Sequence, residues 1–323
     1  MTRLFQKRFL LLIFLLLALS SCASRLPGHC PPECKDVFLR KRSLDRIDLH
    51  DANLSGAVLV ETRLEQANLR GANLSGAILT NANLVRADLS GAVLVGANLR
   101  GANLAGAIVE NTDFSGADMT GATLTRVDLT TANLTAVVLN DARLIGARLW
   151  GAQLPGAQLI GADLRGANLV GANLSGATLI RAEFHGADMR SVNLRGADLS
   201  EASIWGANMI RAKMNEISAS NMFFSGSDLY RANLDGARLY GVDFSGSRLD
   251  QAQMANVQFA GVTFGGAYLL GTNLDKSPLS SDLISPDAEY TFLADISGVR
   301  YDSSTKWPEG FEPPANAVQI GGD

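Results

Sequence analysis

The chain contains 323 residues, of which 47% are hydrophobic, 19% are charged and 7% are aromatic, and it includes 32 glycines. Its 28 basic side chains stand against 32 acidic ones, which gives a formal net charge of −4. Binding that is driven by phosphate neutralisation needs a clustered basic excess, so this composition argues against a nucleic-acid-binding protein. Many small side chains with few aromatic ones favour a narrow, regular core.

A segment with the layout of a signal peptide opens the sequence. Arg3, Lys7 and Arg8 precede an unbroken apolar run over 9–19, which matches the n-region and h-region of an export signal. The run has 11 residues, whereas a membrane-spanning helix needs about 20. The sequence therefore predicts a signal peptide over 1–21 and an exported protein.

Directly after the apolar run, residues 19–22 read Leu-Ser-Ser-Cys and resemble a bacterial lipobox. The resemblance implies lipid attachment at Cys22, which would anchor the mature protein to a membrane of the bacterial cell envelope. Cleavage after Ala23 is the alternative. It would remove Cys22 and leave a soluble protein of the periplasm or of a thylakoid lumen.

Two further cysteines lie close together in the segment 22–43, which we interpret as an anchor or linker followed by an N-terminal cap. In an oxidising compartment, Cys30 and Cys34 could form a disulfide. A metal site that includes His29 is the alternative, but this site lacks a fourth ligand. We therefore expect the disulfide and no metal.

The body of the sequence, 44–274, repeats every five residues. A large apolar residue occupies 46 of its 47 consecutive centres, 33 times as Leu and 13 times as Val, Ile, Met or Phe, and Ala219 is the exception. Two residues before the centre the side chain is small, and it is Ala in 32 cases. A helix would rotate successive centres by about 140°, and a strand would point them to alternate faces. All centres can face inward only if the chain turns once per pentad into a closed coil.

Pentads such as 67–71 (Ala-Asn-Leu-Arg-Gly) and 172–176 (Ala-Asn-Leu-Ser-Gly) resemble the repeats of the pentapeptide-repeat family. The resemblance implies an all-β fold, a right-handed quadrilateral parallel β-helix with four pentads per coil, and hence about 11 to 12 coils. Asparagine gives separate support for a 20-residue period. In one of the four columns that precede the centres it occupies seven of 12 positions, against six of 35 in the other three.

The segment 275–323 lies beyond the repeats and is predicted to be a loop followed by a cap or tail. Residues 294–298 (Ala-Asp-Ile-Ser-Gly) form a pentad outside the main frame, so we expect the chain to rejoin the stack there. The stretch 301–311 resembles the tails of many pentapeptide-repeat proteins, which implies that Trp307 and Phe311 pack in a cap. Such a cap would cover the strand edges that an open coil exposes.

The sequence shows no phosphate-binding glycine loop, no cluster of metal ligands and no nucleophile motif. We therefore expect no enzymatic activity, no cofactor and no nucleic-acid partner. The first hypothesis is an envelope-anchored scaffold or protein-interaction module, and the alternative is a periplasmic or thylakoid-lumen assembly factor for a membrane complex. Resemblance to the fluoroquinolone-resistance members suggests a DNA-mimicking topoisomerase inhibitor, but the export signal and the balanced charge disfavour this function.

One outward column has more apolar residues than a simple solenoid requires. The position after the centre contains Trp150 and then, at 20-residue intervals, Val170, Arg190, Ile210 and Tyr230. Exposed apolar residues stacked about 4.8 Å apart would form a strip, and such strips often mark interaction sites. The alternative is that these residues only stabilise the ladder between coils. If the protein binds a protein partner, we expect the contact to be made by the four apolar members of this column, Trp150, Val170, Ile210 and Tyr230.

Overall fold

The computed structural model describes residues 34–277, 279, 294 and 296–320. The chain divides into two compact units. Unit 1 comprises Met1–Thr123 and Thr131–Asn133, and unit 2 comprises Leu124–Thr130 and Leu134–Asp323. The pentad frame runs without interruption across this division, so the sequence gives no sign of it.

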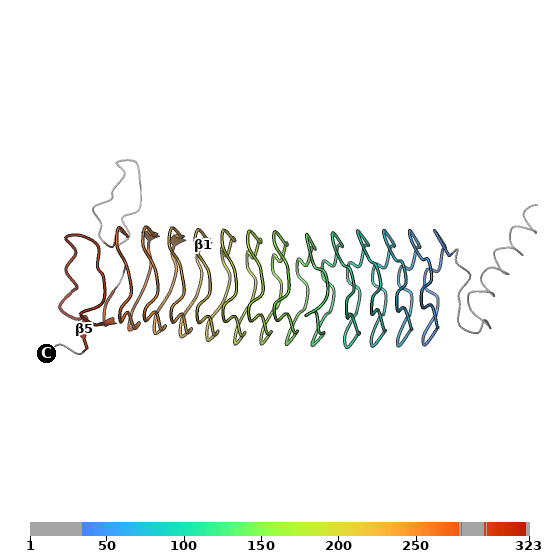
Figure 1. Ribbon diagram of the computed structural model, residues 1–323, viewed down its shortest axis with the longest axis horizontal. Coiled ribbons are helices and arrows are strands. Elements are labelled where there is room, and N and C mark those ends of the chain that lie inside the picture. The colour runs from blue at the N-terminus through green and yellow to red at the C-terminus, as the bar shows by residue number, and fades with distance from the viewer. Residues whose placement is uncertain (1–33, 278, 280–293, 295, 321–323) are drawn as a thin grey trace, which may run out of the picture. The chain divides into compact units, whose positions relative to one another are not determined.

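Unit 1 is a stack of coils whose neighbouring turns are joined by parallel β-bridges (Figure 1). Every bridge joins residues that lie 20 apart, from Phe38 with Val58 to Asp113 with Asn133. A turn follows each bridge residue at five-residue intervals, so a coil has four sides of one pentad each. The expected 20-residue period is therefore confirmed.

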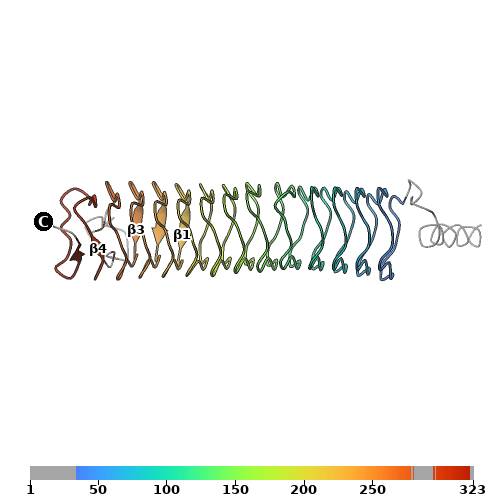
Figure 2. The ribbon, with the colours of Figure 1, turned by 60° about the horizontal axis from the view of Figure 1, so that its bottom comes forward.

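Unit 2 has the same construction, and on one side of it three bridges lengthen into short strands (Figure 2). These strands are β1 (Ser218–Ser220), β2 (Arg238–Tyr240) and β3 (Gln258–Ala260), which form a parallel sheet. In this sheet Ala219 lies opposite Leu239. The small side chain of Ala219 is offset by Ile217 and Met222, which are fully buried where Ala is usual.

The core of each unit consists of the pentad centres together with the small residues two positions before them. Leu and Ala alternate along the inner wall, and from Leu49 onward every centre except Phe259 is buried. In unit 2 the rings of Phe224 and Phe244 stack at 4.9 Å with an interplanar angle of 4°. Phe264 continues this stack at 5.1 Å and 6°. The ring spacing is close to that of neighbouring strands in a sheet, about 4.8 Å, so each ring packs against the ring of the next coil.

Several of the inward positions that usually carry Ala carry Thr or Ser instead. Thr62 is fully buried, and its hydroxyl donates a hydrogen bond of 2.8 Å to the carbonyl oxygen of Leu39 in the preceding coil. A buried hydroxyl without a partner would be destabilising, so this bond explains why the substitution is tolerated. The same bond to the preceding coil is made by Thr112, Ser227, Thr272 and Ser277.

The corners require a backbone with positive φ, and in some coils a carboxylate or amide side chain also occupies the corner. Asn81 has a φ of 55°, and Gly101, one coil later, has a φ of 65°. A Cβ at Gly101 would overlap the Oδ1 atom of Asn81, whereas a Cβ at Gly121 would meet nothing. A larger residue at position 101 would therefore have to displace the Asn81 side chain, in addition to adopting a positive φ. Asp51 and Gly71 form another such pair, as do Asp141 and Gly161.

At its C-terminal end, unit 2 continues with residues from beyond the repeats. Val299 is fully buried, and Arg300 forms a bridge with Tyr268, so this segment adds to the stack as its pentad predicts. Strand β4 (Arg300–Tyr301) pairs in parallel with β5 (Val318–Gln319). The ring of Trp307 lies 5.5 Å from that of Tyr301 and 5.3 Å from that of Phe311, so both expected cap residues pack in one aromatic cluster.

Candidate interaction surfaces

The register of unit 2 places Trp150, Val170, Arg190, Ile210 and Tyr230 on one side, which we call the Trp150 side. Each residue follows a buried centre and points outward, but their exposure differs. The Trp150 side chain is 60% exposed, whereas the three other apolar members are half-buried. Trp150 is therefore the main apolar feature that a partner could reach on this side.

The apolar column of the Trp150 side is less continuous than the sequence suggests. Arg190 interrupts it, and the guanidinium carbon of Arg248 lies 4.5 Å from the centroid of the Tyr230 ring. Arg231 lies 5.1 Å from the same centroid, and the Tyr230 hydroxyl is 3.3 Å from Gln251 Oε1. These cation–π contacts engage Tyr230 within the protein.

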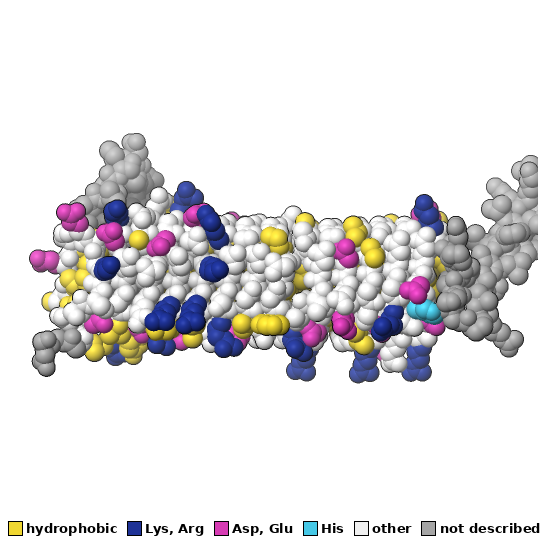
Figure 3. Space-filling model, viewed as in Figure 1, with side chains coloured by type: hydrophobic (Ala, Val, Ile, Leu, Met, Phe, Trp, Pro, Cys, Tyr) yellow, Lys and Arg dark blue, Asp and Glu magenta, His cyan; other side chains and the backbone are white. Residues whose placement is uncertain are grey.

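Arginine–aspartate ion pairs lie beside the apolar residues of the Trp150 side. Arg190 and Asp188 approach to 2.6 Å, and the hydrogen bond from Arg190 keeps the pKa of Asp188 below its usual range. Arg248 pairs with Asp228 at 3.4 Å and with Asp250 at 2.9 Å. The carboxylates of this side are thus interleaved with arginines. Acidic and basic side chains are also mixed on the face that Figure 3 shows.

A second exposed aromatic cluster lies on a different side of unit 2. Trp205 is 54% exposed, and its ring lies 4.6 Å from that of His185 in the preceding coil. His185 Nε2 is 2.5 Å from Ser203 Oγ, and Phe223, which is bridged to Ser203, is 51% exposed. The sequence analysis did not identify this pair, although the 20-residue spacing of His185 and Trp205 places them in successive coils.

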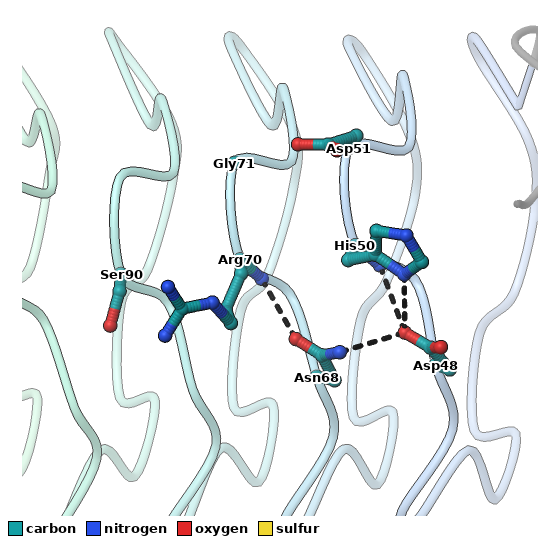
Figure 4. Close-up of a pocket in the computed structure, with 7 residues that line it drawn as sticks. All are labelled: Asp48, His50, Asp51, Asn68, Arg70, Gly71 and Ser90. Atoms are coloured by element: carbon teal, nitrogen blue, oxygen red, sulfur yellow. Dashed lines mark hydrogen bonds and ion pairs between the residues drawn. The ribbon is translucent and has the colours of Figure 1, made fainter. Parts of the chain in front are cut away.

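A polar hollow lies on the first coils of unit 1 (Figure 4). His50 Nδ1 is 2.8 Å from Asp48 Oδ1, and Asn68 Nδ2 donates to the same oxygen at 2.8 Å. The bond with His50 lowers the pKa of Asp48. A carboxylate–imidazole pair can orient a base, but the hydroxyl of Ser90 donates to Asp88 at 2.5 Å and not to His50. Ser90 is therefore not aligned with this pair as a nucleophile.

A further hollow lies on the Trp150 side of unit 2. It is lined by Asp228, Arg248, Asp250 and Tyr268 and by residues of a glycine-rich corner.

Among the described residues, no group of three or more His, Cys, Asp or Glu side chains is placed to bind a metal ion. The same part of the chain contains no helix that is long and apolar enough to cross a membrane.

Several residues that the sequence singles out fall outside the described part of the chain. Cys22 and Cys30 belong to 1–33, so the lipid attachment and the disulfide remain predictions. Cys34 is described, and its side chain is buried at the start of unit 1.

Comparison with known proteins identifies the repeats. The sequence profile of pentapeptide repeats matches in eight copies over residues 47–84, 82–121, 122–157, 157–196, 191–215 and 207–246. A sequence comparison with curated proteins finds no match.

Among solved structures, HetL from Nostoc sp. strain PCC 7120, a pentapeptide repeat protein involved in heterocyst differentiation regulation, is 26% identical. The match covers 77% of this chain and 90% of HetL, with a TM-score of 0.28. AT2G44920, a pentapeptide repeat protein of the Arabidopsis thaliana thylakoid lumen, is 34% identical over 33% of this chain and 70% of that chain, with a TM-score of 0.26. Rfr23 from Cyanothece 51142 is 28% identical over 41% of this chain and 93% of that chain, with a TM-score of 0.26.

Because the repeat profile spans most of the chain, and because the bridges repeat every 20 residues in both units, this protein belongs to the pentapeptide-repeat family.

Proposed function

We propose that the chain is exported, anchored to the bacterial cell envelope through Cys22, and acts there as a non-enzymatic scaffold for protein interaction. The observation that carries the scaffold role is the exposure of large apolar side chains on an otherwise filled stack, including Trp150 at 60% on the Trp150 side. Exposed aromatic residues on a rigid framework are typical anchors of protein interfaces. The anchoring rests on the apolar run and the Leu-Ser-Ser-Cys stretch at 19–22.

The interior of both units supports a scaffold over an enzyme. Core positions are filled by Leu, Ala and other apolar residues, and every buried polar side-chain atom among the described residues has a hydrogen-bond partner. No buried polar group is thus left over for a substrate within this part of the chain. The chemistry that the protein offers lies on its outer sides.

The interleaved ion pairs favour a protein partner over mimicry of a DNA duplex. A duplex presents a dense row of negative charges, whereas on the Trp150 side the carboxylates of Asp128, Asp188 and Asp228 each pair with an arginine. A soluble assembly factor of the periplasm or of a thylakoid lumen is the alternative if Cys22 is removed. The right-handed turn and the number of about 11 to 12 coils also remain predictions for this family member.

The anchor is tested by metabolic labelling with a palmitate analogue. We expect the wild-type protein to carry the label and to remain in the membrane fraction, because several acyl chains give stable attachment at about 0.8 kcal/mol per buried methylene. The Cys22→Ser variant should lose the label. A wild-type protein that is unlabelled and soluble would refute the anchor and favour the soluble alternative.

The partner surface is tested by in-cell cross-linking followed by affinity purification. We expect a Trp150→Ser, Ile210→Ser double variant to lose a partner that is recovered with the wild type, because the variant removes apolar surface from the Trp150 side without touching the core. Trp205→Ser, which removes a similarly exposed ring from another side, is the matched control. Equal recovery of the partner with the double variant and the wild type would show that these apolar residues only stabilise the packing between coils.

A further inference from the structure

Unit 1 begins with an apolar row that faces outward. Phe38, Val58 and Ile78 are bridged to one another in successive coils, so their side chains share one side. Phe38 is 75% exposed and Ile78 is 38% exposed, with Val58 half-buried between them. The row continues with Asn98, so the apolar surface is confined to the first three coils. We call the three residues the Phe38 patch.

Basic residues flank Phe38 in the sequence on both sides. Lys35, Arg40, Lys41 and Arg42 are all exposed in the first coil. Arg40 and Lys41 share a single carboxylate, that of Glu61, at 3.5 and 3.3 Å. Within the described residues, Lys35 and Arg42 form no ion pair.

Over residues 35–42 the first coil has four cations and one carboxylate, that of Asp36, and the matching residues 55–62 of the second coil add only Glu61. The surroundings of the patch therefore keep an excess of positive charge.

The distance along the chain keeps this patch near the proposed anchor. Twelve residue steps separate Cys22 from Cys34, where the described part of unit 1 begins. A fully extended chain of that length reaches about 40 Å. If Cys22 is lipid-modified, the first coil cannot lie farther than this from the bilayer surface, and the patch experiences a high local concentration of lipid.

We propose that the Phe38 patch docks on the anionic surface of a lipid bilayer. Phe38 and Ile78 enter the boundary between headgroups and acyl chains, while Arg40, Lys41 and Arg42 contact the phosphate groups. Apolar side chains flanked by long cationic ones fit such a surface, because Lys and Arg extend toward charge while their stems cover apolar area. The contact would make the first coil a second, reversible attachment beside the acyl chains, so it rests on the proposed anchoring.

The docking is tested by fluorescence of the full-length protein with a Phe38→Trp substitution. The protein is mixed with vesicles of equimolar phosphatidylcholine and phosphatidylglycerol that carry brominated acyl chains, and the signal of the wild type is subtracted. We expect quenching by the brominated chains, because the new indole lies at their depth. An Asn98→Trp variant, which places the indole on the same side one coil beyond the patch, should be quenched less.

The charge requirement is tested in the Phe38→Trp background. Replacing Arg40, Lys41 and Arg42 together by Gln should weaken partitioning by about fivefold per cation, which is on the order of 100-fold in total. Vesicles of phosphatidylcholine alone, or high salt, should have the same effect.

Equal quenching of the Phe38→Trp and Asn98→Trp variants, or quenching that survives removal of the cations, would overturn the proposal. The proposal would also be overturned if an envelope protein, and not lipid, covered the indole at position 38. Failure of palmitate labelling at Cys22 is a separate outcome, because the quenching assay reads the surroundings of residue 38 whether or not an acyl chain is attached.

Discussion

Replacing Leu164 with Asp is expected to destroy the stable fold of unit 2. Leu164 is fully buried, and its neighbours in the adjacent coils, Leu144 and Phe184, are buried as well. An aspartate at this position would place an unpaired charge between two apolar layers, which we expect to cost more than about 4 kcal/mol. Urea unfolding followed by circular dichroism, together with limited proteolysis, would measure the loss.

Arg165→Ala is the control for this change, because it alters the adjacent residue on the outside of the same coil. Arg165 donates to both carboxylate oxygens of Asp163, at 2.8 and 2.7 Å. Exposed ion pairs of this kind contribute little to stability, so the variant should unfold almost as the wild type does. If the two variants lost equal stability, the inward register of the pentad centres would be wrong.

Truncating the middle ring of the phenylalanine stack should have the next largest effect. Phe244 is fully buried and stacks on Phe224 on one side and on Phe264 on the other. The Phe244→Ala variant would leave a cavity between two rings that the coil spacing holds apart, at a cost of about 3–5 kcal/mol in the free energy of unfolding. Equilibrium denaturation of the purified protein would measure it.

Phe223→Ala provides the comparison, because this ring precedes Phe224 but is 51% exposed. Its removal should cost far less than that of Phe244. If the two variants unfolded at the same denaturant concentration, the coils would have closed around the missing Phe244 ring. A closely packed interior that relaxes only partly would not allow this.

The coil was predictable because a spacing of five leaves the chain one way to bury all its centres. The interval of 20 between bridged residues follows the sequence pattern from Phe38 to Asn273. The stack of Phe224, Phe244 and Phe264 was also visible in principle, since the three residues are 20 apart. The division into two units was not, because no residue breaks the pentad frame at the boundary.

The sequence predicts which residues share the Trp150 side but not which of them are available to a partner. The 20-residue register alone places Trp150 and Tyr230 on one side. Whether Tyr230 remains available depends on Arg248, whose guanidinium reaches back across one coil to the ring. The position of the Arg248 guanidinium depends on its rotamer and on its ion pairs with Asp228 and Asp250. The repeat pattern does not determine either of these.

In some coils the corner side chain is matched to a glycine in the next coil. Asp141 fills the space where a Cβ at Gly161 would lie. Deleting residues 142–161 would preserve the pentad frame and every inward leucine position, yet it would bring Arg181 to the corner above Asp141. The Asp141 carboxylate would then have to shift to make room for the arginine Cβ, so a repeat that looks modular along the chain loses a matched corner when it is shortened. The expected cost is that of a side-chain rearrangement and not of a backbone clash.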